Sequence, residues 1–188
     1  MLKLIRNALA SKRILFDRDG SPIKWEFFEK LLHIQEYNFC HLANKLNRKH
    51  VQWFKNKMNV KLAAQTLSNS CAHALEQLLE DGVHEFAECA PTAKFCRMVN
   101  NTFDCLNFKS IVANAYKKPL SRDTAENVLN LFTDSIDYFS SITIEMSGKP
   151  IIEMKLKTGF LGFIIDMTNL KNLYRDYVET GYLRYILS

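Results

Sequence analysis

The sequence has little of what would assign it to a membrane, a secretory pathway or a disulfide framework. No apolar run approaches the roughly 20 residues that a helix needs to cross a bilayer. The opening string M-L-K-L-I-R lacks the continuous apolar stretch of a secretory signal. The five cysteines are odd in number, and no two have the C-x-x-C spacing of a zinc or redox site. These absences predict no membrane contact and free thiols in a reducing compartment, with Cys40 and Cys71 at apolar helix positions.

Sequence signals of nucleotide hydrolysis and of catalysis are missing as well. There is no G-x-x-x-x-G-K-[ST] phosphate loop. The string N-K-L-N at 44–47 resembles the N-K-x-D guanine motif of small GTPases, but Asn47 cannot accept both guanine N–H groups as a carboxylate does. The five histidines form no i,i+4 pair with a carboxylate and are interpreted as satisfied surface residues. We expect no metal site and no catalysis by the chain alone, although a triad assembled from distant segments stays open.

The apolar residues that are present predict a mainly helical fold. They make up 47% of the 188 residues, which is typical of a globular chain with one substantial core. Their spacing of three and four residues is that of amphipathic helices. Ser21 and Pro22 are expected to cap and open the second helix. The expected helices cover 1–10, Trp25 to Leu46 as one long helix, 60–78, Pro91 to Leu106, 121–139, and 159 through Val178.

The texture changes toward the C-terminus. Short β-branched runs flank the turn string S-G-K-P at 147–150, which predicts a β-hairpin near 142–154. The resulting order of elements suggests two ends from a mixed α/β structure around a helical insertion. We expect boundaries at 1–20, 21–141 and 142–188.

Positive charge is concentrated in one stretch of the sequence. No acidic residue lies between Glu36 and Glu76, whereas a solvated helix normally mixes both signs of charge. The aromatic residues Trp53 and Phe54 lie inside this stretch. The pattern suits the phosphate groups of a nucleotide or a nucleic acid, and the alternative is a solvated helix face. The cations are Lys45, Arg48, Lys49, Lys55, Lys57 and Lys61.

Several strings, taken together and in order, carry a family resemblance. They are M-L-K-L-I-R-N at 1–7, S-P-I-K-W-E at 21–26, L-A-N-K-L at 42–46, K-M-N-V-K-L-A-A-Q-T-L-S at 57–68, F-D-C-L-N at 103–107 and K-T-G-F-L-G-F at 157–163. This series resembles the P-element transposases and their vertebrate relatives that carry an N-terminal THAP zinc finger. The likeness covers nearly the whole chain.

The resemblance implies an architecture and a limit on activity. In that family a helical insertion that binds GTP splits an RNase H-like catalytic domain. Residues 1–20 would then end the first RNase H-like segment, 21–141 would form the insertion, and 142–188 would hold the hairpin and start the second segment. The family's catalytic acids lie just before the match to Leu2 and just after Ser188. Because two-metal phosphoryl chemistry needs such carboxylates, the 188 residues are not expected to cut or join DNA.

The resemblance also implies a nucleotide site. It places the base-reading residues at Phe103, Asp104 and Asn107, and lysine and backbone contacts around Lys45, Asn59 and Val60. On one helix, the first three would project over a single patch. An aspartate accepts from both guanine N1–H and N2–H, a phenylalanine stacks on the base, and an asparagine meets O6 or N7. The expected cofactor is GTP, with no metal held within the chain.

The leading interpretation is therefore the GTP-binding insertion domain of a P-element-like transposase, as a gene fragment or a truncated or domesticated copy. The expected partners are a guanine nucleotide, transposon DNA, and full-length transposase or a second copy of the chain. The expected location is the nucleus by resemblance and the cytoplasm otherwise. One alternative is a nucleotide-independent repressor that pairs with full-length transposase. Another is direct nucleic-acid binding through Lys45 to Lys61, with a steep salt dependence.

Overall fold

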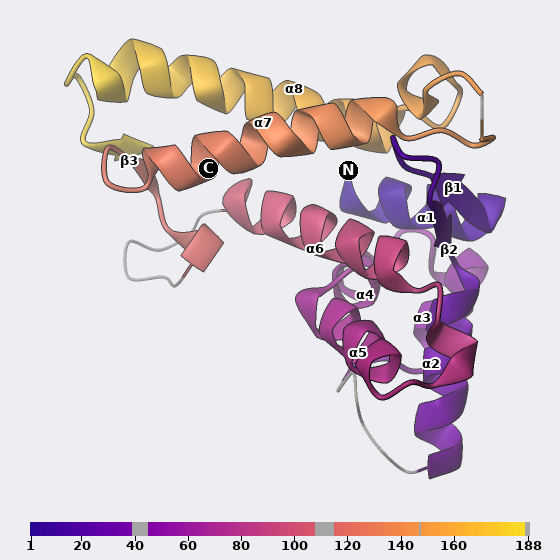
Figure 1. Cartoon of the computed structure of the whole chain (residues 1–188). Coiled ribbons are helices and arrows are strands. Elements are labelled where there is room, and N and C mark those ends of the chain that lie inside the picture. Colours follow the sequence, from indigo (N-terminus) through magenta and orange to yellow (C-terminus); the bar gives the residue numbers. More distant parts are fainter. Residues whose placement is uncertain (39–44, 108–114, 147, 187–188) are drawn as a thin grey trace.

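The computed structural model describes residues 1–38, 45–107, 115–146 and 148–186, and helices dominate them (Figure 1). The α-helices are α1 (Leu2–Lys12), α2 (Glu26–Asn38), α3 (Arg48–Val51), α4 (Val60–Thr66), α5 (Asn69–Glu80), α6 (Ala90–Cys105), α7 (Ala125–Ser141) and α8 (Thr158–Leu173). Short helical turns are η1 (Trp53–Asn56), η2 (His84–Phe86), η3 (Ala115–Lys117), η4 (Ile151–Glu153) and the π-helical η5 (Tyr174–Glu179). The strands are β1 (Ile14–Phe16), β2 (Pro22–Lys24), β3 (Leu120–Ser121) and β4 (Tyr185–Ile186). The predicted mainly helical fold is confirmed.

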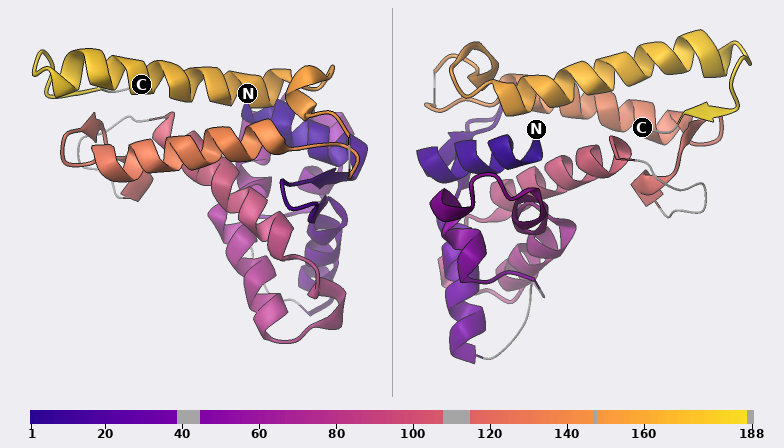
Figure 2. Two further views of the ribbon diagram at one scale, coloured as in Figure 1. Left: turned by 45° about the horizontal axis from the view of Figure 1, so that its top comes forward. Right: turned by 180° about the vertical axis from the view of Figure 1, so that it is seen from behind.

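The helices are arranged as a long antiparallel pair with a helical lobe beside it. Helices α7 and α8 lie side by side along one edge of the molecule, and α2 to α6 project away from them (Figure 1 and Figure 2). Helix α1 packs against α8 on one side and against α4 on the other. The two parts therefore meet at α1, the first helix of the chain. No helix among the described ranges is long and apolar enough to span a membrane.

Aromatic side chains fill the core that holds the antiparallel pair together. Phe139 of α7 lies 6.2 Å from Phe160 and 5.8 Å from Phe163 of α8, measured between ring centroids. Trp25 and Phe28, at the start of α2, are fully buried with their rings 5.1 Å apart. Such pairs add directional ring contacts to the free energy gained from apolar burial.

The cysteines belong to this core. Those in the described ranges, Cys71, Cys89, Cys96 and Cys105, are buried free thiols, and Cys40 lies outside these ranges. Burial raises the pKa of Cys71 to about 11 and that of Cys105 to about 12, so both stay protonated and act as small apolar side chains.

The glycines of the K-T-G-F-L-G-F string let α8 approach α1 closely. A Cβ atom on Gly159 would lie 2.9 Å from the backbone nitrogen of Ile5 and 3.0 Å from the Leu4 Cβ atom. A Cβ atom on Gly162 would meet the side chain of Met1. The sequence string therefore marks a helix crossing, and Gly159 faces backbone that cannot easily move aside.

The predicted helix start at Ser21 and Pro22 is wrong. Pro22 opens strand β2, which pairs antiparallel with β1, and α2 begins only at Glu26. A carboxylate oxygen of Asp17 accepts hydrogen bonds from the N–H groups of Asp19 and Ser21, at 3.0 and 2.9 Å, and closes the turn between the strands. A serine followed by proline suits both a helix start and an edge strand, and here the turn decides.

Two predicted long helices are interrupted. The expected helix from Trp25 does not reach Leu46, because residues 45–47 are not helical; Phe39 and Leu42 lie outside the described residues. The expected helix over 60–78 is two helices, because Ser68 caps a new start by accepting a hydrogen bond from the N–H of Cys71 at 3.2 Å. The apolar spacing continues across both breaks and therefore does not reveal them.

The reversal predicted near 142–154 is present, but its pairing is short. Thr143 bridges antiparallel to both Pro150 and Phe16, and the N–H of Ile151 donates to the carbonyl of Ile142 at 2.7 Å. The second expected strand then ends, because Ile151 is fully buried and begins the turn η4.

Candidate nucleotide site

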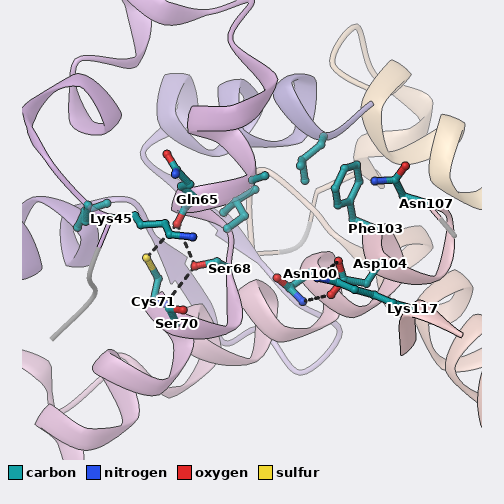
Figure 3. A pocket seen from close by; sticks show the side chains of 14 residues that line it. Lys45, Gln65, Ser68, Ser70, Cys71, Asn100, Phe103, Asp104, Asn107 and Lys117 are labelled. Atoms are coloured by element: carbon teal, nitrogen blue, oxygen red, sulfur yellow. Dashed lines mark hydrogen bonds and ion pairs between the residues drawn. The ribbon is translucent and has the colours of Figure 1, made fainter. Parts of the chain in front are cut away.

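A cavity of about 650 Å³ lies between the start of α5, the end of α6 and the residues before α3 (Figure 3). Four of the six residues expected at the nucleotide line it. Phe103, Asp104 and Asn107 stand on one side and Lys45 on the other. The structure therefore brings residues more than fifty positions apart in the sequence to one cavity.

Asn107 reaches this cavity by a different route from the one expected. Helix α6 ends at Cys105, and the N–H of Asn107 bonds to the carbonyl of Asp104 in a closing turn at 3.2 Å. The prediction that Phe103, Asp104 and Asn107 share one helix is therefore wrong. All three line the cavity because the chain turns at the helix end, which leaves Asn107 exposed.

Asp104 is a partly buried carboxylate with spare acceptor capacity. One carboxylate oxygen accepts a hydrogen bond from the amide of Asn100 at 3.0 Å, and the other lies 3.8 Å from the ammonium of Lys117. Burial raises the pKa of Asp104, and both neighbours oppose this rise. An ionised carboxylate has about four acceptor positions. Both oxygens can therefore still accept from N–H groups of a ligand, which would offset part of the cost of burial.

A second cavity of about 730 Å³ adjoins the first and shares Lys45 and Gln65 with it. No carboxylate lines it, and among the described residues none of its lysines has an ion-pair partner. Unpaired lysines in a concave surface raise the local concentration of anions. The lysines that line it are Lys45, Lys49, Lys55 and Lys61.

The last two expected contact residues lie at or beside this second cavity. Asn59 lines it and also caps α4, since its side-chain oxygen accepts from the N–H of Leu62 at 3.0 Å. Val60 follows as the first residue of α4; its side chain is 46% exposed, and it lines neither cavity. Asn59 is thus held in place by its capping bond, while a contact from Val60 would have to come through its backbone.

His50 supports the wall between the two cavities. It is 1% exposed, and its ring nitrogens lie 3.1 Å from the side-chain oxygens of Gln65 and Asn47. Burial lowers the pKa of His50, which favours the neutral ring. The interpretation of the histidines as surface residues is wrong for His50.

Comparison with known proteins agrees with this geometry. The model of a family described as TNP-like, GTP-binding insertion domain matches residues 1–119. The chain belongs to this family. It is 31% identical over 185 residues to the human DNA transposase THAP9, covering 95% of this chain and 19% of that protein. It is 23% identical over 192 residues to the transposable element P transposase of Drosophila melanogaster, covering 100% of this chain and 24% of that protein.

The fold of this insertion-domain protein is found in a solved structure. The Drosophila P element transposase strand transfer complex superposes with a TM-score of 0.78 at 24% identity, covering 99% of this chain and 40% of that one. The predicted family, the P-element transposases and their THAP-carrying relatives, is confirmed, and so is the fold. The chain spans about one fifth to one quarter of the length of the curated relatives.

Some residues of the insertion-domain cavity were not predicted. Asn100 precedes Asp104 by one helical turn, so the i,i+4 spacing on α6 was a signal that could have found it. Lys117 and Gln65 carry no such signal, because they reach the cavity through the tertiary fold.

Proposed function

We propose that the chain binds a guanine nucleotide as the GTP-binding insertion of a P-element-like DNA transposase. The observation that supports this is the pair of adjoining cavities with opposite chemistry. The first offers a carboxylate beside a phenylalanine, and the second offers lysines without any acid. The base would occupy the first cavity, with Asp104 on N1–H and N2–H, and the phosphates would extend past Lys45 into the second.

The position of Lys45 supports this division. Lys45 lines both cavities, is exposed, and has no hydrogen bond or ion pair among the described residues. It lies where the sugar and phosphates would join the base. A purine in the first cavity and a triphosphate in the second would therefore share one lysine at the junction.

Replacing Lys45 and Lys61 with Gln should weaken GTP binding about tenfold or more and leave guanosine binding nearly unchanged, because lysines on phosphate act through charge. Calorimetric titration with GTP and guanosine measures both effects. Lys57→Gln is the matched control, because Lys57 lies in the same basic stretch and lines neither cavity. Equal losses for GTP and guanosine would contradict a phosphate role for this cavity.

We propose that residues 21–141 form the insertion, and that 1–20 and 142–188 are pieces of an RNase H-like domain. The chain would then be a fragment, or a truncated or domesticated copy, that acts in the nucleus on transposon DNA, with GTP positioning the DNA. These assignments rest on the family and on the two named transposases among its relatives.

The 188-residue chain should not nick or join DNA in Mg²⁺ or Mn²⁺. The family's catalytic acids lie outside the matched stretch, and phosphoryl transfer needs carboxylates that hold the ions. An end-labelled transposon-end duplex incubated with purified chain should stay intact. Nicking that co-purifies with the chain through a second chromatographic step would overturn this proposal.

The second candidate is a nucleotide-independent protein that pairs with full-length transposase. Exposed apolar side chains after α8 favour it, since Tyr182 is 85% exposed and Tyr177 and Leu183 are about half exposed. The titration separates the two, because this candidate predicts no guanine-specific binding.

A further inference from the structure

A third cavity, of about 260 Å³, lies beside α1 and the turn η1 and shares no lining residue with the two nucleotide cavities. Three segments that are distant in sequence build it. Helix α1 contributes Asn7, the η1 region contributes Trp53 and Lys57, and the residues leading into α8 contribute Lys155 and Thr158. The predicted basic stretch is thus divided, with Lys57 in this cavity and four other lysines in the second.

The charged residues that line this third cavity have one sign. No carboxylate lines it, and Lys57 and Lys155 have no ion-pair partner among the described residues. The ammonium of Lys57 lies 5.5 Å from the ring centroid of Trp53. This cation–π contact holds the lysine beside the aromatic ring and leaves N–H donors for an anion.

A buried cation beneath the cavity adds to the positive field. Arg6 is 0% exposed, and among the described residues no carboxylate pairs with it. Its guanidinium donates to the side-chain oxygen of Asn7 at 2.7 Å and to the carbonyl of Asn56 at 2.9 Å. The remaining nitrogen, Nη1, is buried without a hydrogen bond.

This arrangement is costly unless something compensates it. A buried charge is normally paired, because removal from water is unfavourable for an ion. Arg6 contacts two lining residues of the cavity, through Asn7 directly and through the carbonyl of Lys57 at 3.5 Å. An anion held by Lys57 and Lys155 would lie close to this uncompensated charge and would be attracted by all three cations.

We propose that the third cavity binds the phosphodiester backbone of DNA. A hollow of about 260 Å³ lies below the range of roughly 300–1,000 Å³ that small-molecule ligands occupy, but a backbone phosphate needs only a few donors. Lysine, asparagine and threonine side chains are typical phosphate contacts, and they occur here as Lys57, Lys155, Asn7 and Thr158. The choice of DNA over another polyanion rests on the proposed transposase function; the site itself does not depend on nucleotide binding.

The test is fluorescence anisotropy of a labelled DNA duplex over a series of salt concentrations. The double variant Lys57→Gln with Lys155→Gln should bind at least about tenfold more weakly at low salt. Its slope of log affinity against log salt should fall by about 2, since each lost phosphate contact removes about 0.9. The loss should be similar for unrelated DNA sequences, because backbone contacts do not identify bases.

Lys171→Gln is the control for the general loss of positive charge. Lys171 lies on the same helix, thirteen residues from Thr158, which is about 20 Å along the axis. Circular dichroism checks that the variants keep the helical fold. An unchanged salt slope in the double variant, an equal loss in Lys171→Gln, or no DNA binding by wild type at 50 mM salt would each overturn the proposal.

Further arms separate this surface from the nucleotide site and from other ligands. GTP affinity should be unchanged in the double variant, and DNA affinity should survive Lys45→Gln with Lys61→Gln. DNA binding lost only in the latter pair would move the DNA surface to the second cavity and overturn the proposal. Tighter binding of an RNA duplex, with the same dependence on Lys57 and Lys155, would overturn the choice of DNA. Absent GTP binding with the predicted DNA results would remove the nucleotide function and leave this surface standing.

Discussion

Replacing Asp104 with Asn should convert a preference for GTP into a preference for XTP. The amide of Asn100 donates to one oxygen of Asp104, so an asparagine there would keep its oxygen on that side. Its NH₂ group would then point where the other carboxylate oxygen now lies, near Lys117. That NH₂ group repels the N2–H of guanine and donates to the C2 carbonyl of xanthine.

The expected loss is large because the lost hydrogen bonds are charge-assisted. Each such bond contributes about 1.5–3 kcal/mol, so GTP affinity should fall about tenfold or more, while XTP affinity rises. Calorimetric titration of wild type and variant with GTP, ATP and XTP measures the preference. Asp134→Asn, an exposed aspartate on α7 that lines none of the three cavities described, is the control for charge.

Two results would remove Asp104 from base recognition. One is equal affinity of wild type for GTP and ATP, because adenine offers no paired N1–H and N2–H donors. The other is an unchanged base preference in Asp104→Asn. Retained GTP preference in a folded variant would place guanine recognition on other residues of the cavity.

The part of the site on α6 was predictable from sequence, and the part that crosses the fold was not. Pro91 and the apolar spacing define α6 correctly, and that helix carries Phe103 and Asp104. Lys45 reaches the same cavity only through tertiary packing, which periodicity does not encode. The family resemblance supplied Lys45, because it carries information about the folded arrangement.

The errors in the predicted fold have a common physical cause. Apolar spacing reports which face of the chain is buried, and it stays in phase when a cap such as Ser68 starts a new helix. Strand β2 is three residues long, too short for an alternating pattern to compete with the helix-start signal of Ser21 and Pro22. Tertiary contacts and turn hydrogen bonds decided both cases.

The packing of α1 links the sites to the rest of the molecule. Leu2 lines the first cavity, Arg6 bonds to the carbonyl of Asn56 beside the second, and Ile5 packs against Gly159 of α8. Both parts of the fold therefore depend on one helix crossing. A substitution that separates α1 from α8 should be among the most destabilising in the chain.

Gly159→Ala should lower the free energy of unfolding by about 1–3 kcal/mol, the usual cost of overpacking a well-filled contact. The new Cβ atom would lie 2.9 Å from the backbone nitrogen of Ile5, so α1 or α8 would have to shift. Gly162→Ala is the matched control on the same helix face. Its Cβ atom would meet only the flexible end of the Met1 side chain, 2.5 Å from the sulfur, which can rotate away.

The two alanine variants should therefore differ in sign or in size. Alanine has a helix propensity up to about 1 kcal/mol better than glycine, so Gly162→Ala should be neutral or stabilising. Denaturant unfolding followed by circular dichroism measures both, and each kcal/mol should shift Tm by about 2–4 °C for a chain of this size. A Gly159→Ala variant as stable as wild type would show that α8 does not approach the α1 backbone this closely, and equal destabilisation of both variants would point to a general need for glycine in α8 instead of a single tight crossing.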